Sequence, residues 1–255
     1  MIHPTAIIDS QAELGDGVEV GPYTVIGPHV KIGSDTRVLG HVYLDGHTTI
    51  GPACEIYPFS SIGTRTQDLK FNGNLTYVKI GTRTTIREYV TINSATDEGE
   101  TTLVGDDVLL MAHSHVAHSC VVGDRVVIAN CGTLAGHVTM EDDSILGGLS
   151  GIHQFVRVGR MAMLGGASKI TRDCPPYMII DGHPAAVRAI NKIGLERKSV
   201  KPAIIAAIKN AYRTLYRKEL AVSPALEIIE TTPDLCEEVR YLIEFIRGSK
   251  RGIIR

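Results

Sequence analysis

The chain has 255 residues, of which 44% are hydrophobic but only 5% aromatic, with 26 glycines and no tryptophan. Its core must therefore consist of aliphatic side chains. The formal net charge of −2 excludes a typical nucleic-acid-binding protein, which carries a clear basic excess. No stretch approaches the roughly 18 apolar residues of a membrane span, and the N-terminus lacks the pattern of a signal peptide.

The 5 cysteines are scattered and form no C-x-x-C pair, so we expect neither a disulfide framework nor a zinc ribbon. Their odd number favours reduced thiols in a cytoplasmic protein. The chain also lacks the glycine-rich phosphate-binding motifs and the G-x-S-x-G motif. The common nucleotide-binding and hydrolase classes are therefore excluded.

From Ile2 to Ile170, every sixth residue is aliphatic or Met, except at Asp68, Asn74 and Glu98. A helix with 3.6 residues per turn would spread such residues over all its faces. Short parallel strands joined by tight corners can instead direct each aliphatic side chain inward, so that three repeats make one triangular coil of 18 residues. Residues 1–175 are therefore predicted to form a parallel β-helix.

Glycine often follows the inward aliphatic residue directly, and the residue four positions after that aliphatic is mostly small or β-branched. We expect both types at the corners, where a bulky side chain or a backbone restricted to negative φ would not fit. The glycines concerned are Gly15, Gly21, Gly33, Gly51, Gly81 and Gly105.

Two stretches interrupt the repeat, Thr64–Tyr77 and Asn93–Leu103, yet the aliphatic phase returns after each one. We expect two loops that leave the prism, because long loops on a rigid scaffold often carry function. Surface insertions without a role are the alternative.

Residues 176–255 are predicted to form a connecting segment and a C-terminal helical domain. A helix is expected from about Pro202, since apolar residues recur there at helical spacing. Pro224 and Pro233 mark the starts of two further helices, and Gly248 marks the end of the last one.

The segment from Arg188 to Lys218 carries a net charge of +8, although the whole chain carries −2. A solvated helix face is the commonest reason for such a run. A concentrated positive patch also suits a diphosphate or an acidic protein partner.

Five of the 10 histidines lie close together in the sequence, at His113, His115, His118, His137 and His153. With coils of 18 residues, His118, Gly136 and Gln154 should lie one above another, and His137 and His153 flank that column. A neutral histidine can act as general base, and the N–H of a glycine can point at a developing oxyanion.

The residues alone leave two other interpretations open. Three converging histidines could bind Zn²⁺, as in the prism-shaped zinc carbonic anhydrases, or the histidines could simply face solvent. His118 is flanked by Ala117 and Ser119 rather than by carboxylates, so general-base chemistry is favoured over metal binding.

The motifs His115-Val116-Ala117-His118, Leu134-Ala135-Gly136-His137-Val138 and His153-Gln154-Phe155 occur in this order. Together they resemble the acyl-carrier-protein-dependent UDP-N-acetylglucosamine O-acyltransferases of lipid A biosynthesis. The likeness extends through Gln67–Phe71 and Ile86–Ile92 to Asn210–Tyr212, nearly the whole chain.

The resemblance implies a left-handed β-helix and transfer of an (R)-3-hydroxyacyl chain from acyl carrier protein to the 3-position of UDP-N-acetylglucosamine. It also implies a cytoplasmic homotrimer with active sites between subunits, and no metal or other cofactor. His118 would be the general base and Gly136 the oxyanion donor. The expected substrate-binding residues are Asp68 and Lys70 on the first loop, His115, His137, His153 and Gln154 in the groove, Gly166 along the acyl chain, and Asn191 and Arg197 at the UDP end.

The sequence departs from the family at Ser119, where Asp is common, and at Asn93, where His is common. It also departs at Ile193, where Glu is common, and at Gly182-His183-Pro184 in place of Gly-Asn-His. Because these changes would surround the sugar, N-acyl transfer to a 3-amino sugar nucleotide is the main alternative. A zinc-dependent lyase of the carbonic anhydrase type and a prism without turnover are more distant alternatives.

Overall fold

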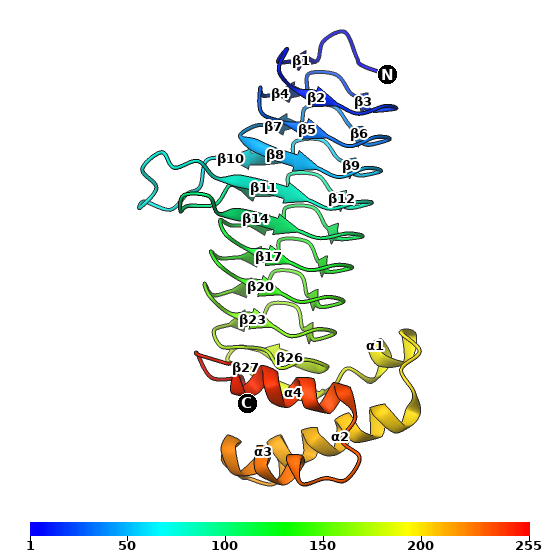
Figure 1. Ribbon diagram of the computed structural model, residues 1–255, viewed down its shortest axis with the longest axis vertical. Coiled ribbons are helices and arrows are strands. Elements are labelled where there is room, and N and C mark those ends of the chain that lie inside the picture. The colour runs from blue at the N-terminus through cyan, green and yellow to red at the C-terminus, as the bar shows by residue number, and fades with distance from the viewer.

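The computed structural model describes residues 1–255, and its main body is a prism of stacked triangular coils (Figure 1). Each of the three sides is a sheet of short strands, called here sheets A, B and C. The chain runs from sheet B to sheet C and then to sheet A in each coil, and it winds left-handed. The predicted left-handed parallel β-helix is therefore confirmed.

The strands of each sheet follow one another along the prism. Sheet B contains β1 (Ile7–Ile8), β4 (Val25–Ile26), β7 (Tyr43–Leu44), β10 (Ser61–Thr64), β13 (Thr91–Asn93), β16 (His115–Val116), β19 (Thr133–Leu134), β22 (Gly151–Ile152) and β25 (Lys169–Ile170). Sheet C contains β2 (Glu13–Leu14), β5 (Lys31–Ile32), β8 (His47–Ile50), β11 (Tyr77–Ile80), β14 (Thr101–Val104), β17 (Val121–Val122), β20 (Thr139–Met140) and β23 (Arg157–Val158). Sheet A contains β3 (Glu19–Val20), β6 (Arg37–Val38), β9 (Glu55–Ile56), β12 (Thr85–Ile86), β15 (Leu109–Leu110), β18 (Val127–Ile128), β21 (Ile145–Leu146), β24 (Met163–Leu164), β26 (Met178–Gly182) and β27 (Ala185–Ile190).

The core is a single column of aliphatic side chains that runs the length of the prism, and the inward residue of almost every strand is buried. A second inward position lies at the corners and holds small residues such as Thr24 and Thr36. Their hydroxyls donate to backbone carbonyls, Thr24 Oγ1 to Leu39 O at 2.7 Å and Thr36 Oγ1 to Gly51 O at 2.9 Å. These bonds avoid the cost of an unpaired hydroxyl in an apolar interior.

The corners correct one prediction about glycine. Among the glycines that directly follow the inward aliphatic, only Gly63 in β10 has a positive φ, of +80°. At most corners the left-handed position comes two residues after the glycine and is held by ordinary residues such as Tyr23, His113 and Leu149. The glycines are needed for close approach instead. A Cβ on Gly51, for example, would lie 2.6 Å from Gly81 O on the next coil.

At each such corner, one residue lies between the residue that follows the inward aliphatic and the left-handed residue. Its N–H donates to no backbone carbonyl in any coil. Pro22, Pro52, Pro58 and Pro176 occupy this position at four corners, as expected for a site that needs no donor. At other corners the N–H binds a carboxylate: Asp106 N donates to Asp124 Oδ1 at 2.8 Å, and Asp124 N to Asp142 Oδ1 at 3.0 Å. We call this residue the open corner position.

Both predicted loops leave the prism at the corner between sheets B and C (Figure 1). The first covers residues 65–76 and the second residues 94–100, so the second is shorter than predicted because residues 101–103 already belong to β14. Two hydrogen bonds connect the loops: Asn74 Nδ2 donates to Thr96 O at 2.9 Å, and Gly99 N donates to Leu75 O at 2.9 Å.

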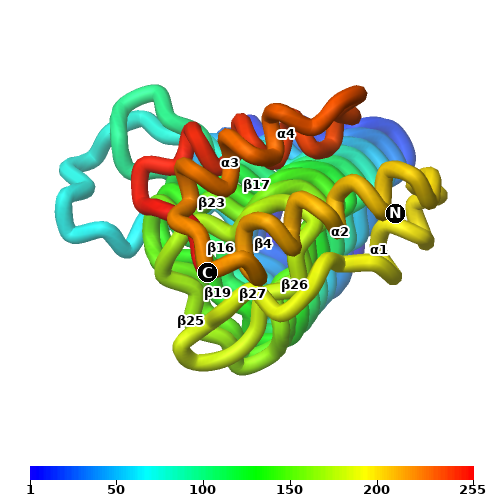
Figure 2. Tube along the Cα trace, turned by 90° about the horizontal axis from the view of Figure 1, so that it is seen from below, coloured from blue at the N-terminus to red at the C-terminus, as the bar shows by residue number.

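The C-terminal region closes the end of the prism (Figures 1 and 2). The antiparallel hairpin β26–β27 extends sheet A and is followed by α1 (Lys192–Arg197), α2 (Pro202–Arg217), α3 (Val222–Glu230) and α4 (Glu237–Arg247). The sequence predicted the last three helices but missed the hairpin and α1. Tyr241 of α4 donates to Glu141 on the prism and stacks under Arg160 at 4.0 Å. None of the helices is long and apolar enough to cross a bilayer.

Replacing Gly51 by Ala should destabilise the protein by about 1–3 kcal/mol, because the new methyl group would overlap the backbone of the next coil. Gly151→Ala is the matched control, since a Cβ there meets nothing within 4 Å. Urea unfolding of both variants provides the measurement. Equal midpoints for the two variants would contradict the close-approach role of Gly51.

Candidate active site

The predicted histidine column exists and lies at the corner between sheets B and C. The imidazole of His118 occupies the space in which Gly136 would carry a Cβ, so only glycine allows the ring to lie there. Gly136 is at the open corner position, and its N–H donates no hydrogen bond within the chain. His137 follows it, and His137 N donates to His118 O at 3.0 Å. The base candidate and a free backbone donor are thus brought together by the stacking of two coils.

A cavity of about 550 Å³ opens beside His118 and gathers residues from the corner, the first loop and the end of β13. His118 Nε2 lies 3.8 Å from Asp68 Oδ2, too far for a hydrogen bond. Lys70 N donates to the other oxygen, Asp68 Oδ1, at 2.9 Å and so orients the carboxylate. The lining residues are Gln67, Asp68, Leu69, Lys70, Asn93, His115, Ala117, His118 and Gln154.

Burial keeps the histidines of this cavity neutral. The pKa of His118 lies below its ordinary value of 6.5, first because burial disfavours the imidazolium and second because His137 lies close by; Asp68, Glu100 and Asp97 act in the opposite direction. The pKa of His115 is also lowered by burial and by His118. A neutral imidazole is the form that can accept a proton.

Contacts between aromatic rings stabilise the corner that carries His118. His118 and His137 meet edge to face, with ring centroids 5.0 Å apart, and His137 stacks on Phe155 at 4.6 Å. His115 Nδ1 is bonded to Thr91 Oγ1 at 2.7 Å across sheet B. His118 Nδ1, in contrast, is buried and has no hydrogen-bond partner.

Six predicted site residues do not line this cavity: Gly136 and His137 adjoin His118 at the corner, and the other four lie farther away. His153 is exposed and its Nδ1 lies 3.3 Å from Arg251 Nη2, while Gly166 lies at the different corner between sheets A and B. Asn191 and Arg197 belong to the start and end of α1, on the opposite side of the prism from the first loop (Figures 1 and 2). One chain alone does not bring these residues to His118.

The side chain of Asn191 is already engaged within the chain, which the sequence did not predict. It caps α1 by accepting from Gly194 N at 3.0 Å, and its Nδ2 donates to Met161 O at 2.9 Å. Arg197 is exposed and free of ion pairs. Of this pair, only Arg197 has its side chain available for a ligand.

Sequence reasoning missed several members of the cavity. Gln67 and Leu69 flank Asp68 on the first loop, and both follow from the same loop signal that identified Asp68 and Lys70. Asn93, in contrast, is among the positions expected around the sugar; it lines the cavity and is buried, and its Nδ2 donates to Thr64 Oγ1 at 3.2 Å. The link between Ser119 and Glu100, at 2.6 Å, could not be foreseen because no repeat relates these two positions.

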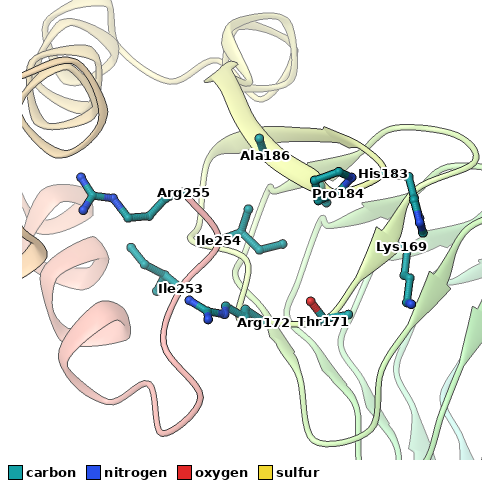
Figure 3. Close-up of a pocket in the computed structure, with 10 residues that line it drawn as sticks. Lys169, Thr171, Arg172, His183, Pro184, Ala186, Ile253, Ile254 and Arg255 are labelled. Carbon is teal, nitrogen blue, oxygen red and sulfur yellow. The ribbon is translucent and has the colours of Figure 1, made fainter. Parts of the chain in front are cut away.

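A separate cavity of about 560 Å³ lies where the last coil, the β26–β27 hairpin and the C-terminal segment meet (Figure 3). Its basic lining residues are Lys169, Arg172, His183 and Arg255, and Ile253 and Ile254 lie between the two arginines (Figure 3). Lys169 is in register with Gly151, which pairs in turn with Thr133, so this cavity and His115 share the outer face of sheet B.

No three His, Cys, Asp or Glu side chains of the chain come together in an arrangement that could hold a metal ion. All 5 cysteines are free thiols. The chemistry available at the corner is therefore that of a neutral imidazole, a carboxylate, a lysine and a free backbone N–H.

Comparison with known proteins gives a consistent result. The family described as Udp N-acetylglucosamine O-acyltransferase, domain 2, matches residues 173–254, and the family described as bacterial transferase hexapeptide (six repeats) matches residues 101–136. The chain is 45% identical to an acyl-[acyl-carrier-protein]--UDP-N-acetylglucosamine O-acyltransferase from Verminephrobacter eiseniae, covering 100% of this chain and 99% of the relative. A relative of the same name from Synechocystis sp. is 49% identical over 89% of this chain and 82% of its own length.

Solved structures agree over the full length. The chain is similar to LpxA, a UDP-N-acetylglucosamine acyltransferase from Bacteroides fragilis, with a TM-score of 0.96, 38% identity and complete coverage of both chains. It is also similar to LpxA from Acinetobacter baumannii, with a TM-score of 0.95, 39% identity and coverage of 100% of this chain and 99% of that one.

The imidazoles of His118 and His115 should both titrate below pH 6.5, because burial disfavours their charged forms. NMR titration of the ring Cε1 protons measures both values, and the loss of one signal in His118→Ala assigns it. A His118 pKa above 6.5 would show that the surrounding carboxylates outweigh burial.

Proposed function

Since the chain belongs to the acyl-carrier-protein-dependent UDP-N-acetylglucosamine O-acyltransferases, we propose that it transfers an (R)-3-hydroxyacyl chain from acyl carrier protein to the 3-hydroxyl of UDP-N-acetylglucosamine. This reaction is the first step of lipid A biosynthesis. The single observation that carries the proposal is the neutral His118 ring lying over Gly136, whose N–H is free.

In the proposed mechanism, His118 Nε2 accepts the proton of the sugar 3-hydroxyl while the oxygen attacks the thioester carbonyl carbon. The negative charge that develops on the carbonyl oxygen accepts a hydrogen bond from Gly136 N–H. The open corner position suits this role, since the equivalent N–H groups of Asp106 and Asp124 already bind carboxylate oxygens. The carbon–sulfur bond then breaks, and the His118 imidazolium returns its proton to the thiolate of the carrier.

Asp68 and Lys70 would hold the sugar at this corner. The Asp68 carboxylate faces His118 Nε2 across 3.8 Å and can accept a hydrogen bond from a second sugar hydroxyl, beside the one that donates to His118. His115 and Gln154 line the same cavity and would contact the sugar nucleotide or the acyl chain. His137 supports the base through its edge-to-face contact, and His153 marks the rim of the groove. No step needs a metal or another cofactor.

We propose a homotrimer in which each active site lies between two prisms. Gly166 lies at a different corner of the prism from His118, and Arg197 belongs to α1 on the side opposite the first loop, so a neighbouring copy would supply them (Figure 2). Arg197 would contact the UDP phosphates, and Asn191 would act by fixing the start of α1 beside it. Gly166 is exposed at a corner and carries no side chain that would obstruct an acyl chain.

An acidic acyl carrier protein would dock on the positive segment around α1 and α2. Lys192, Lys201, Lys209 and Arg213 are exposed there. Lys198 instead pairs with Asp143 on the prism at 2.6 Å, so part of the charge in this segment anchors α1. Reduced thiols and a soluble carrier as donor both suit a cytoplasmic location.

The test is to offer the purified protein an (R)-3-hydroxyacyl carrier protein with either UDP-N-acetylglucosamine or its 3-amino analogue, and to follow product by mass spectrometry. We expect transfer to the 3-hydroxyl. His118→Ala should lower turnover by about 10² to 10⁴ while the oligomer stays intact by size-exclusion chromatography. Transfer to the amine alone would establish the N-acyltransferase alternative. If no acyl donor supports transfer, the proposed activity is wrong and the protein binds ligands without turnover.

Gly136→Ala should lower kcat by about 10² or more, because the methyl group displaces the His118 ring and disturbs the oxyanion donor. Gly148→Ala is the control. It occupies the open corner position at another edge, where the nearest atom to a Cβ is Asn130 O at 3.2 Å, and it should retain turnover close to wild type. Equal turnover of the two variants would contradict the proposed role of the His118–Gly136 stack.

A further inference from the structure

Ser119 follows the catalytic base directly and is tied to the segment that ends the second loop. Its Oγ–H donates to Glu100 Oε2 at 2.6 Å, and its N–H donates to Thr102 Oγ1 at 2.9 Å. Ser119 has a φ of +57°, the left-handed conformation that ordinary residues adopt at the equivalent position of most corners. The coil thus sets the backbone of this corner, and Glu100 and Thr102 hold Ser119 within it.

Glu100 is itself held in place. Its carbonyl accepts from Tyr77 N at 2.9 Å, and its N–H donates to Asp97 O at 3.1 Å, so the residue is anchored on both sides just before β14. Its carboxylate is half-buried, accepts a hydrogen bond from Ser119 and forms no ion pair with any Lys, Arg or His. A fixed negative charge without a cationic partner therefore lies next to the base.

The ionisable groups around His118 come from every element packed against it. They are His137 on the next coil, His115 on β16, Asp68 and Lys70 on the first loop, and Asp97 and Glu100 on the second loop. Asp97 is exposed, and Asp68 faces the space where the sugar is proposed to bind. Glu100 is the one carboxylate in this set that is both half-buried and bonded to the residue adjoining His118.

His118 needs such support, since its Nδ1 is buried without a hydrogen-bond partner. When Nε2 takes up a proton, the positive charge spreads over a ring that faces Asp68 at 3.8 Å on the Nε2 side but has no hydrogen-bond partner at Nδ1. A nearby fixed negative charge lowers the free energy of that imidazolium and so assists proton transfer.

We propose that Glu100, acting through Ser119, is a positioning residue of the acyl-transfer reaction: it holds Ser119 beside His118 and stabilises the imidazolium formed in the transition state. This inference rests on the proposed function. It adds a carboxylate from the second loop, a segment that otherwise supplies none of the groups assigned to the reaction.

Glu100→Gln keeps the shape of the side chain but removes its charge. We expect kcat to fall by about 3- to 30-fold. In the pH profile of kcat/KM, the midpoint of the acidic limb should move to lower pH by about half a unit, because a histidine that loses a nearby negative charge has a lower pKa. KM for UDP-N-acetylglucosamine should stay near the wild-type value. If Glu100→Gln only disordered the loop, activity would fall but the acidic limb of the kcat/KM profile would stay at the wild-type pH.

Glu98→Gln is the matched control. Glu98 lies on the same loop, but its carboxylate accepts from Leu75 N at 2.9 Å and does not contact Ser119. Its pH profile should match wild type. Ser119→Ala is the second variant, which keeps Glu100 charged but breaks the link; it should lower kcat with a smaller shift of the limb.

A rescue variant distinguishes an effect of the lost negative charge from an effect of altered side-chain packing. In the double variant Glu100→Gln/Ser119→Asp, the carboxylate returns one residue from His118, and Asp tolerates a left-handed φ well. We expect most of kcat to recover and the limb to move back to higher pH. Ser119→Asp alone would place two carboxylates in contact, so it should lose activity instead.

NMR titration of His118 in Glu100→Gln makes the result independent of turnover. A pKa lower than in wild type supports the inference even if the acceptor has been misassigned. An unchanged pKa and pH profile in Glu100→Gln, or a rescue variant no better than Glu100→Gln, would overturn it. If the wild-type protein shows this titration but no acyl transfer, the proposed function fails and not the coupling of Glu100 to His118.

Discussion

The structure depends on one constraint, the parallel register that places each residue directly under the residue one coil earlier. Ile8 pairs with Ile26, and each later strand repeats this relation. Identical environments therefore recur at a fixed spacing in the chain, and side chains at equivalent positions stack. The rings of Tyr23, His41, Phe59, Tyr89 and His113 form such a ladder along the corner between sheets A and B. The same stacking brings His118 onto Gly136.

The loops show how strict this register is. Ile62 pairs with Ile92, and Ile92 with Val116, so both loops lengthen a coil by whole repeats. An insertion of any other length would turn the inward aliphatic side chains of the following coil toward solvent. The protein can thus extend segments around the active-site corner without disturbing the core, and these segments carry Asp68, Lys70 and Glu100.

Register also explains which parts could be predicted from the sequence. The β-helix, its core and the His118–Gly136 column follow from a repeat, because spacing in the chain then equals position in space. The left-handed residues at the corners were misplaced, since hydropathy does not reveal which corner residue turns the chain. The β26–β27 hairpin and the Ser119–Glu100 bond lie outside the repeat, where side-chain contacts depend on loop conformations that no periodic pattern specifies.

The open corner position has a consequence for how such a catalyst tolerates change. The backbones of His118 and Gly136 are one step between stacked strands apart, about 4.8 Å, which backbone hydrogen bonding determines. Loop conformation does not set this distance between the two backbones. Substitutions elsewhere on the surface can therefore accumulate without separating His118 from Gly136, because the β-helix itself fixes the spacing of these two residues. Each coil presents an equivalent N–H, so the feature peculiar to this corner is the histidine one coil before a glycine.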